Sequence, residues 1–322
     1  MSVMQISRRG APCVRPDVRP LWGSVRKPFF AHEGARKVRP YKMSRLASES
    51  LARASKGRVH SVFTRCFNIT TPAGDWLTVA LAPFPQTPDS IIVNASGIGA
   101  DFSPQLCVVA GMPVEISREE ISIPDADVVF AFSGAEIFDT RREPFVRSNR
   151  AAHNLALAEE IIQRHGRECD FPELQRRITP AIAALREGIL RNDAAAIRAQ
   201  CEALLGLGVG LTPSGDDILC GVTAGLFLGG VTENENQFVP VLRELLPTAG
   251  ERTTDISVRS LRLCVVGEIS GVVFDAARAI MCGEAREVDL AISALLEVGG
   301  TSGTEMARGL CLGIQLAEEL RG

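Results

Sequence analysis

Residues 206–217 read GLGVGLTPSGDD, and this stretch differs from every other part of the chain. Its three glycines at alternate positions cannot form a helix interior and make a poor strand, because each lacks a side chain to pack and costs backbone entropy. They predict a loop whose backbone approaches another group closely. The residues from Asp217 to Leu228 are apolar on every side, so a buried helix is expected directly after the loop.

A second copy of the pattern, GGTSGTE, lies at residues 299–305. Ser214 with Asp217, and Ser302 with Glu305, have the spacing of a capping box, in which a serine and an acid each bond the backbone N–H of the other. We therefore expect two buried helices that begin with the same chemistry and lie side by side.

Glycines recur every fourth residue along both predicted helices, at Gly221, Gly225 and Gly229 in one and at Gly309 and Gly313 in the other. A glycine inside a helix costs about 1 kcal/mol relative to alanine, so a regular row of them needs a reason. The spacing predicts a face on which two helices approach closely.

The two helix starts are a candidate anion site. A helix N-terminus presents unpaired N–H groups and about half a positive charge, and it binds phosphate or carboxylate readily. Two such ends with hydroxyls beside them can hold a substrate with two anionic ends. The alternative is plain capping, which every buried helix needs. The candidate substrate-binding residues are Gly208, Gly210, Thr212, Ser214, Gly215, Thr254, Ser257, Thr301, Ser302, Gly303 and Glu305.

The candidate catalytic residues are Asp216 and Asp217. Asp217 has the capping position, whereas Asp216 has no capping duty in this scheme and its counterpart in the second copy is Thr304. Asp216 is therefore the stronger candidate for chemistry. A carboxylate beside an anion site accepts a hydrogen bond from a substrate N–H or binds a metal ion shared with phosphate. We favour the first, with no metal site and Mg²⁺ as the weaker possibility, because no further carboxylate cluster or phosphate-contacting lysine accompanies the pair.

The predicted fold class is α+β, with a small antiparallel sheet or barrel followed by an all-helical domain. Short apolar runs separated by turn residues predict strands at residues 62–63, 76–81, 91–93, 112–116 and 128–132. Helical periodicity predicts helices at 148–165, 172–191, 193–205, 215–230, 237–247, 253–265, 268–282, 286–297 and 303–320. The β-rich domain is expected over residues 43–145 and the helical domain, which carries both motifs, over 146–322.

Residues 1–42 are predicted to be a disordered basic tail. They hold ten Lys or Arg residues and two acids, a local balance of +8 that leaves −11 for the rest of a chain with net charge −3. A mildly acidic body is a poor match for a phosphate backbone, so we expect no nucleic acid partner. The longest uncharged run has fifteen residues, too short for the ~20 that cross a bilayer, so no membrane partner is expected. Nine cysteines without a C-x-x-C pair indicate reduced thiols and a cytoplasmic protein.

The motifs resemble those of the AllH family, also labelled DUF2877. The resemblance rests on GLGVGLTPSGDD at 206–217 and GGTSGTE at 299–305, supported by Thr253, Thr254 and Ile256 to Val258, and covers roughly residues 57–322. It implies a subunit of an oxamate carbamoyltransferase of anaerobic allantoin degradation, which moves a carbamoyl group between carbamoyl phosphate and oxamate, giving oxalurate and phosphate. It also implies two kinds of partner, an FdrA-like subunit and a DUF1116-type subunit.

Two positions depart from the family pattern. The family commonly has histidine before Thr-Ser-Gly, where this chain has Gly300, and aspartate where this chain has Glu305. Losing an imidazole removes a possible general acid or phosphate donor. From the resemblance, the function expected is a carbamoyltransferase subunit, with a non-catalytic assembly or anion-sensing subunit as the alternative. A stand-alone Mg²⁺-dependent phosphate-transferring or hydrolysing enzyme is the weakest possibility.

Overall fold

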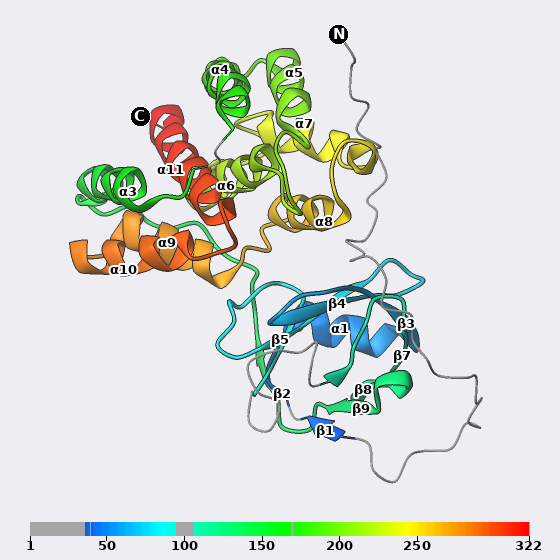
Figure 1. Ribbon diagram of the computed structural model, residues 1–322. Helices are drawn as coiled ribbons and strands as arrows, with labels where there is room; N and C mark the ends of the chain where they lie inside the picture. Colours follow the sequence, from blue (N-terminus) through cyan, green and yellow to red (C-terminus); the bar gives the residue numbers. More distant parts are fainter. Residues whose placement is uncertain (1–35, 39, 95–105, 169–170, 322) are drawn as a thin grey trace. The chain divides into compact units, whose positions relative to one another are not determined.

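The computed structural model describes residues 36–38, 40–94, 106–168 and 171–321 (Figure 1). Within them the chain first forms a β sheet with one helix and then continues as helices to its end, which confirms the predicted α+β class. No helix in these ranges is long and apolar enough to cross a membrane.

The sheet has ten strands in the described part, in the order β1-β9-β8-β7-β3-β4-β5-β6-β2-β10. Most neighbouring strands are antiparallel, but β1 with β9, β5 with β6, and β10 with β2 are parallel, so the sheet is mixed. Four of the five predicted strands are present, whereas the run predicted at 62–63 only touches the end of β3, a strand that begins at Lys56 and ends at Val62. The bounds are β1 Arg36–Val38, β2 Pro40–Ser44, β3 Lys56–Val62, β4 Cys66–Thr70, β5 Trp76–Leu81, β6 Ser90–Val93, β7 Pro113–Ile116, β8 Glu120–Ile123, β9 Val128–Ala131 and β10 Glu136–Phe138.

The first two strands show that the sheet curls. β1 pairs with β9 at one end of the strand order, whereas β2 pairs with β6 and β10 at the other end. Only residue 39 separates β1 from β2, and a strand advances about 3.3 Å per residue, so the two ends of the sheet must lie close together. The prediction of a disordered tail through residue 42 is therefore wrong at residues 36–38 and 40–42. The rest of that tail, residues 1–35 and 39, lies outside the described residues.

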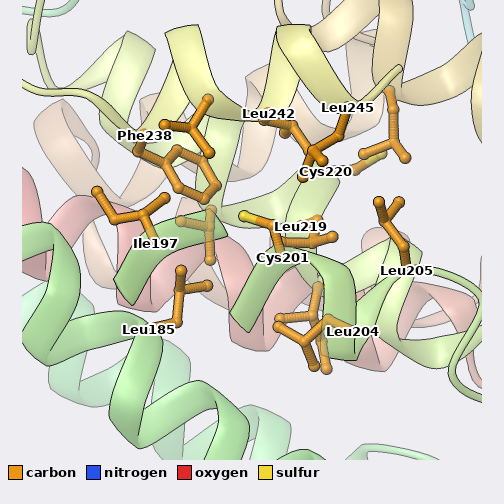
Figure 2. Packing of buried hydrophobic residues seen from close by; sticks show 14 of the residues in the cluster. Leu185, Ile197, Cys201, Leu204, Leu205, Leu219, Cys220, Phe238, Leu242 and Leu245 are labelled. Carbon is orange, nitrogen blue, oxygen red and sulfur yellow. The ribbon is translucent and has the colours of Figure 1, made fainter. Parts of the chain in front are cut away.

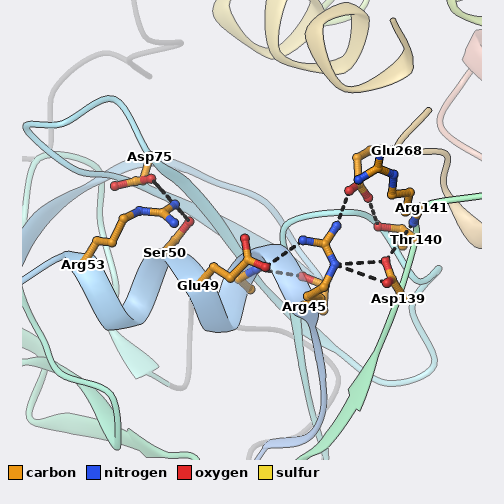
Figure 3. A network of polar contacts seen from close by, with 11 residues as sticks. Arg45, Glu49, Ser50, Arg53, Asp75, Asp139, Thr140, Arg141 and Glu268 are labelled. Atoms are coloured by element: carbon orange, nitrogen blue, oxygen red, sulfur yellow. Dashed lines mark hydrogen bonds and ion pairs between the residues drawn. The ribbon is translucent and has the colours of Figure 1, made fainter. Parts of the chain in front are cut away.

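Helix α1 (Arg45–Arg53) follows β2 directly and packs on β2 and β5. Ser44 caps it by accepting the N–H of Ala47 at 3.0 Å, and Ala47 and Leu51 face the core of the sheet. Arg45, its first residue, binds Glu49 at 2.7 Å, Asp139 at 3.2 Å and the buried Glu268 (Figure 3). The guanidinium thus links α1 to Glu268, which lies in the segment between α8 (Asp255–Cys264) and α9 (Gly271–Cys282).

All nine predicted helices are present, each within three residues of its predicted ends. Besides α8 and α9 they are α3 Ala151–His165, α4 Pro172–Leu190, α5 Ala194–Leu204, α6 Ser214–Leu228, α7 Phe238–Leu245, α10 Ala285–Leu296 and α11 Ser302–Arg321, and short 3₁₀ turns occupy Pro124–Ala126 and Ala249–Glu251.

Helix α6 is the buried centre of the helical domain, as its sequence predicts. One side packs against α4, α5 and α7, where Leu219 and Cys220 lie among Leu185, Ile197 and Phe238 (Figure 2). Its other side joins a second cluster formed mainly by α3, α9, α10 and α11. Because apolar neighbours surround α6, it needs no polar face.

Helices α6 and α11 pack against each other in parallel through their glycines. A Cβ placed on Gly221 would lie 2.3 Å from the carbonyl oxygen of Met306, and one on Gly309 would lie 2.3 Å from that of Ile218. Gly225 and Gly313 form the next close pair along the helices. This confirms the packing role predicted for the glycine spacing.

The same register relates the two helix starts. Gly221 faces Gly309, so counting back equally along both helices matches Ser214 with Ser302 and Asp217 with Glu305. The hydroxyls of Thr212 and Ser302 are 2.7 Å apart, so the starts do lie side by side. The two copies of the motif are therefore equivalent in position as well as in sequence.

Candidate functional site

The loop before α6 folds back onto the helix it precedes. Gly206, Gly208 and Gly210 all have positive φ, at 73°, 135° and 95°. A Cβ on Gly208 would lie 2.5 Å from the backbone nitrogen of Ser214, so glycine is required there. The close approach predicted from the sequence is thus made to the start of α6. Gly210 lies at the exposed tip of the loop, between Val209 and Leu211, whose side chains are 59% and 53% exposed.

The capping box predicted for α6 is wrong. The N-cap residue is Pro213, with extended ψ of 143°, and the helix begins at Ser214 itself. No side chain caps this end, and the N–H groups of Asp216 and Asp217 bond the carbonyl of Pro213 at 2.9 and 3.2 Å. Because Ser214 is already the first helical residue, its hydroxyl has lost the capping position that the motif spacing assigned to it.

The backbone N–H groups at both starts are mostly occupied by the preceding loops. Gly215 donates to the carbonyl of Leu207 at 2.8 Å, so within the described residues three of the first four N–H groups of α6 bond a loop carbonyl and that of Ser214 does not. At α11, Gly303 donates to Val298 at 2.9 Å and Glu305 to Thr301 at 3.1 Å. The row of unpaired N–H groups expected from the sequence is therefore much reduced, and side chains must supply most of the polar contacts.

Gly215 and Gly303 are needed for packing at the two starts. A Cβ on Gly215 would lie 2.1 Å from the carbonyl oxygen of Leu204, and one on Gly303 would lie 2.0 Å from that of Leu295. Each glycine lets the end of the preceding helix touch the start of α6 or α11. Close packing alone therefore explains why these two positions are glycine, and contact with a ligand is not needed to explain it.

Asp216 anchors two neighbouring segments. It is 1% exposed, one carboxylate oxygen accepts the N–H of Gly206 at 2.9 Å, and the other accepts the hydroxyl of Thr253. Burial raises the pKa of Asp216, and these two bonds oppose that rise. The sequence left Asp216 without a structural duty, and that reasoning is wrong. Thr304, at the equivalent position in α11, has a similar role, since its hydroxyl accepts the N–H of Arg167 at 2.8 Å.

Asp217 lies between the two helix starts. It is 4% exposed, and burial raises its pKa well above the ordinary aspartate value, while the nearby hydroxyls of Ser302 and Thr212 lower it. The carboxyls of Asp216 and Glu305 raise it further. A buried acid whose pKa is moved toward neutrality is suited to proton transfer.

Glu305 is the buried acid of the second copy. It is 1% exposed, and no hydrogen-bond partner for its Oε1 exists in the described part of the chain. Nη1 of Arg308 is 3.5 Å from that oxygen, and Nη2 of Arg308 binds Glu168 at 2.7 Å. Burial raises the pKa of Glu305, and Arg308 opposes that rise. The sequence reasoning did not include Arg308, although its position one helical turn after Glu305 was a usable signal.

The segment before α8 completes the cluster. Thr254 caps α8 by accepting the N–H of Ser257 at 3.1 Å, and its hydroxyl donates to the carbonyl of Leu211 at 2.6 Å. Ser257 is 1% exposed, and its hydroxyl lowers the pKa of the neighbouring Asp216. Thr253, through Asp216, and Thr254, through Leu211, tie the start of α8 to α6 and to the loop before it.

The structure thus brings together three segments that are far apart in the sequence, at residues 206–217, 253–257 and 299–305. Thr301 and Ser302 are half-buried at the rim of this cluster, and its interior holds Asp216, Asp217 and Glu305. No group of three or more His, Cys, Asp or Glu residues in the described ranges has the arrangement of a metal site. Acceptors and hydroxyls dominate, so the cluster can accept protons and N–H groups.

Two family models match this chain. The model of oxamate carbamoyltransferase subunit AllH matches residues 204–314, and the model of the AllH family N-terminal domain matches residues 35–137. The first match begins just before the glycine loop and includes all three converging segments. No curated protein matches the chain, and no solved structure matches it either.

Proposed function

This chain belongs to the AllH family, and from that premise we propose that it is a subunit of a carbamoyltransferase whose substrates are small anions. The observation that carries the proposal is the convergence of the segments 206–217, 253–257 and 299–305, all inside the matched range, around buried carboxyls. The proposed partners are an FdrA-like and a DUF1116-type subunit, and the proposed substrates are carbamoyl phosphate and oxamate.

In the proposed reaction the amide nitrogen of oxamate attacks the carbonyl carbon of carbamoyl phosphate. A C–N bond forms, the C–O bond to phosphate breaks, and the attacking nitrogen gives up one proton. Asp217 is the proposed acceptor of that proton, because its raised pKa suits a general base and its carboxyl lies between the helix starts. Asp216 is the weaker candidate, since donors within the chain occupy both of its oxygens.

The helix ends contribute to the proposed site through their partial positive charge. Phosphate leaves with increasing negative charge, and the parallel starts of α6 and α11 place two positive dipole ends side by side. The N–H of Ser214 and the hydroxyls of Thr212, Thr301 and Ser302 are the proposed donors. Donors held in place before the reaction stabilise such a charge most effectively.

The test is a colorimetric assay of carbamoyl transfer from carbamoyl phosphate to oxamate, with the partner subunits present and absent. Asp217→Asn is expected to lower turnover of the assembled complex about 100-fold or more, the usual contribution of a positioned base. Asp289→Asn, on the exposed side of α10, is the matched control and should leave turnover unchanged. Equal turnover of the Asp217 variant and the wild type would remove the catalytic role.

A non-catalytic role in assembly or anion sensing is the second candidate. It is favoured by the loop carbonyls that occupy most of the N–H groups at the helix starts. In that case Asp217→Asn would leave turnover unchanged and would instead alter the stoichiometry of the complex, measured by size-exclusion chromatography with light scattering.

A further inference from the structure

Helix α8 holds the loop before α6 through the residues at its own start. The hydroxyl of Thr253 donates to the carboxylate of Asp216, and that of Thr254, the N-cap of α8, donates to the carbonyl of Leu211 at 2.6 Å. The buried face of α8 packs against α6 itself. The position of α8 therefore helps to decide where Asp216 and the glycine loop lie.

A second face of α8 contacts residues of the sheet region. Asp255 and Arg259 are four residues apart, so they lie on the same side of the helix. Oδ2 of Asp255 is 3.5 Å from Nε2 of His60 in β3. Nε of Arg259 is 3.4 Å from Oδ2 of Asp89, the residue directly before β6. One helix thus contacts the sheet region with one face and the candidate site with its first turn.

The contact between Arg259 and Asp89 is the stronger of these two. Asp89 is 6% exposed, and its backbone carbonyl accepts the N–H of Thr78 in β5 at 2.9 Å, so the sheet fixes its position. Burial raises the pKa of Asp89, and the guanidinium of Arg259 opposes that rise. The side chain of Asp255 is 75% exposed, and exposed ion pairs contribute little. Of the two, the ion pair with Asp89 is therefore the one that holds α8.

We infer that Asp89 and Arg259 are positioning residues of the candidate site, because their ion pair fixes α8 and α8 in turn fixes the loop before α6. Neither residue lies in the three converging segments. Arg259 is about 8 Å along the helix from Thr254, at about 1.5 Å per residue, so it acts through α8. The inference rests on the proposed function, since the loop leads into Asp217, the proposed base. The alternative is an ion pair that stabilises the fold as a whole.

Hydrogen exchange of the full chain, followed by mass spectrometry, tests the inference. The reporter is the peptide of residues 204–216, in which the N–H of Gly206 is bonded to Asp216. Asp89→Asn keeps the shape of the side chain and weakens the ion pair. It should speed exchange in the reporter about threefold to tenfold, the effect of weakening one hydrogen bond to a charged group, and leave peptides of α3 and α10 unchanged.

Variants of α8 provide the controls. Arg259→Gln should speed exchange in the reporter as Asp89→Asn does, and Arg259→Lys, which keeps the charge, should restore most of the protection. Arg262→Gln is the matched control, because Arg262 is exposed on the same helix, and it should change exchange by less than about twofold. The double variant Asp89→Asn, Arg259→Gln should exchange no faster than the faster single variant, since both changes remove the same pair.

Two results of this experiment overturn the inference. Exchange in the reporter that is equal in Asp89→Asn and in the Arg262→Gln control would show that the ion pair does not reach the loop. A rise of equal size in all helices would show that the pair only stabilises the fold. The bond between Arg45 and Glu268 remains in every variant, so the sheet region and the helices stay joined during the measurement.

Turnover of the assembled complex separates this inference from the proposed function. Asp89→Asn should lower carbamoyl transfer about threefold to tenfold, because a loop that opens more often misplaces the base it carries. Transfer by the complex, with exchange in the reporter unchanged by Asp89→Asn, would support the function and overturn the positioning role. Faster exchange confined to the reporter, in a complex that transfers no carbamoyl group, would support the positioning role and overturn the function.

Discussion

Adding one methyl group between α6 and α11 tests whether the glycine contact aligns the two motifs. In Gly309→Ala the new Cβ would lie 2.3 Å from the carbonyl oxygen of Ile218 and 3.1 Å from the Cα of Gly221. Ordinary contact begins near 3.4 Å, so the helices must separate by about 1 Å, and a close-packed interior resists such a shift.

The expected loss of stability follows from two opposing effects. Overpacking a tight core costs about 1–3 kcal/mol, and the upper end applies here because the Cβ meets backbone that cannot rotate away. Alanine regains about 1 kcal/mol of helix propensity. The net loss is about 2 kcal/mol, which lowers the thermal midpoint by about 4–8 °C for a domain of this size.

Urea unfolding followed by circular dichroism at 222 nm reports on the helices and measures this loss. Gly250→Ala is the control, because a Cβ there would meet nothing within 4 Å, and it should change stability by less than about 0.5 kcal/mol. In the double variant with Gly221→Ala the loss should be smaller than the sum of the single losses, since the first methyl group already separates the helices. Full additivity, or a Gly309→Ala protein as stable as the wild type, would refute the reasoning.

Three further predictions concern the buried carboxyls. Because burial raises the pKa of Asp217 in the folded state, the free energy of unfolding of the wild type should fall as the pH rises above about 4, the ordinary pKa of aspartate. Asp217→Asn should match the wild type below about pH 4 and become relatively more stable above it. A difference between the two proteins that does not change with pH in urea unfolding would contradict this. Asp216→Ala removes the acceptor of two internal donors and should lower the free energy of unfolding by about 2–3 kcal/mol. An unchanged urea midpoint would contradict this. Glu268→Gln weakens the half-buried ion pair with Arg45 and should cost about 1 kcal/mol. A thermal midpoint equal to that of the wild type would show that the pair adds nothing.

The helical half was largely predictable because its signals are local and repeated. Apolar periodicity places all nine helices, and the glycine spacing together with the doubled motif predicts that α6 and α11 pack side by side. The sheet was less predictable. β1, β2 and β10 pair with strands far away in the sequence, so tertiary pairing rather than local pattern defines them. β4 and β8 were also missed, although each pairs with the strands next to it in the chain.

The sequence predicts which segments meet at the candidate site, but not the hydrogen bonds that they form there. The sequence identifies the three segments that meet, but Pro213 shifts the start of α6 by one residue and removes the predicted capping box. The duty of Asp216 toward Gly206 and Thr253 depends on how two loops fold back, which no spacing rule reveals. Arg308 lies one helical turn after Glu305 in the sequence, but the burial of Glu305 depends on how α11 packs.

Strands β1 and β2, at residues 36–38 and 40–44, hold the two ends of the curled sheet together. They supply one strand to β9 and, after a single intervening residue, another that sits between β6 and β10. A shortened protein that starts at Met43 would release both ends of the sheet at once and expose the backbone of β6, β9 and β10. Unpaired edges of this kind promote aggregation, so any trimmed version intended for crystals or assays should retain the chain from before Arg36.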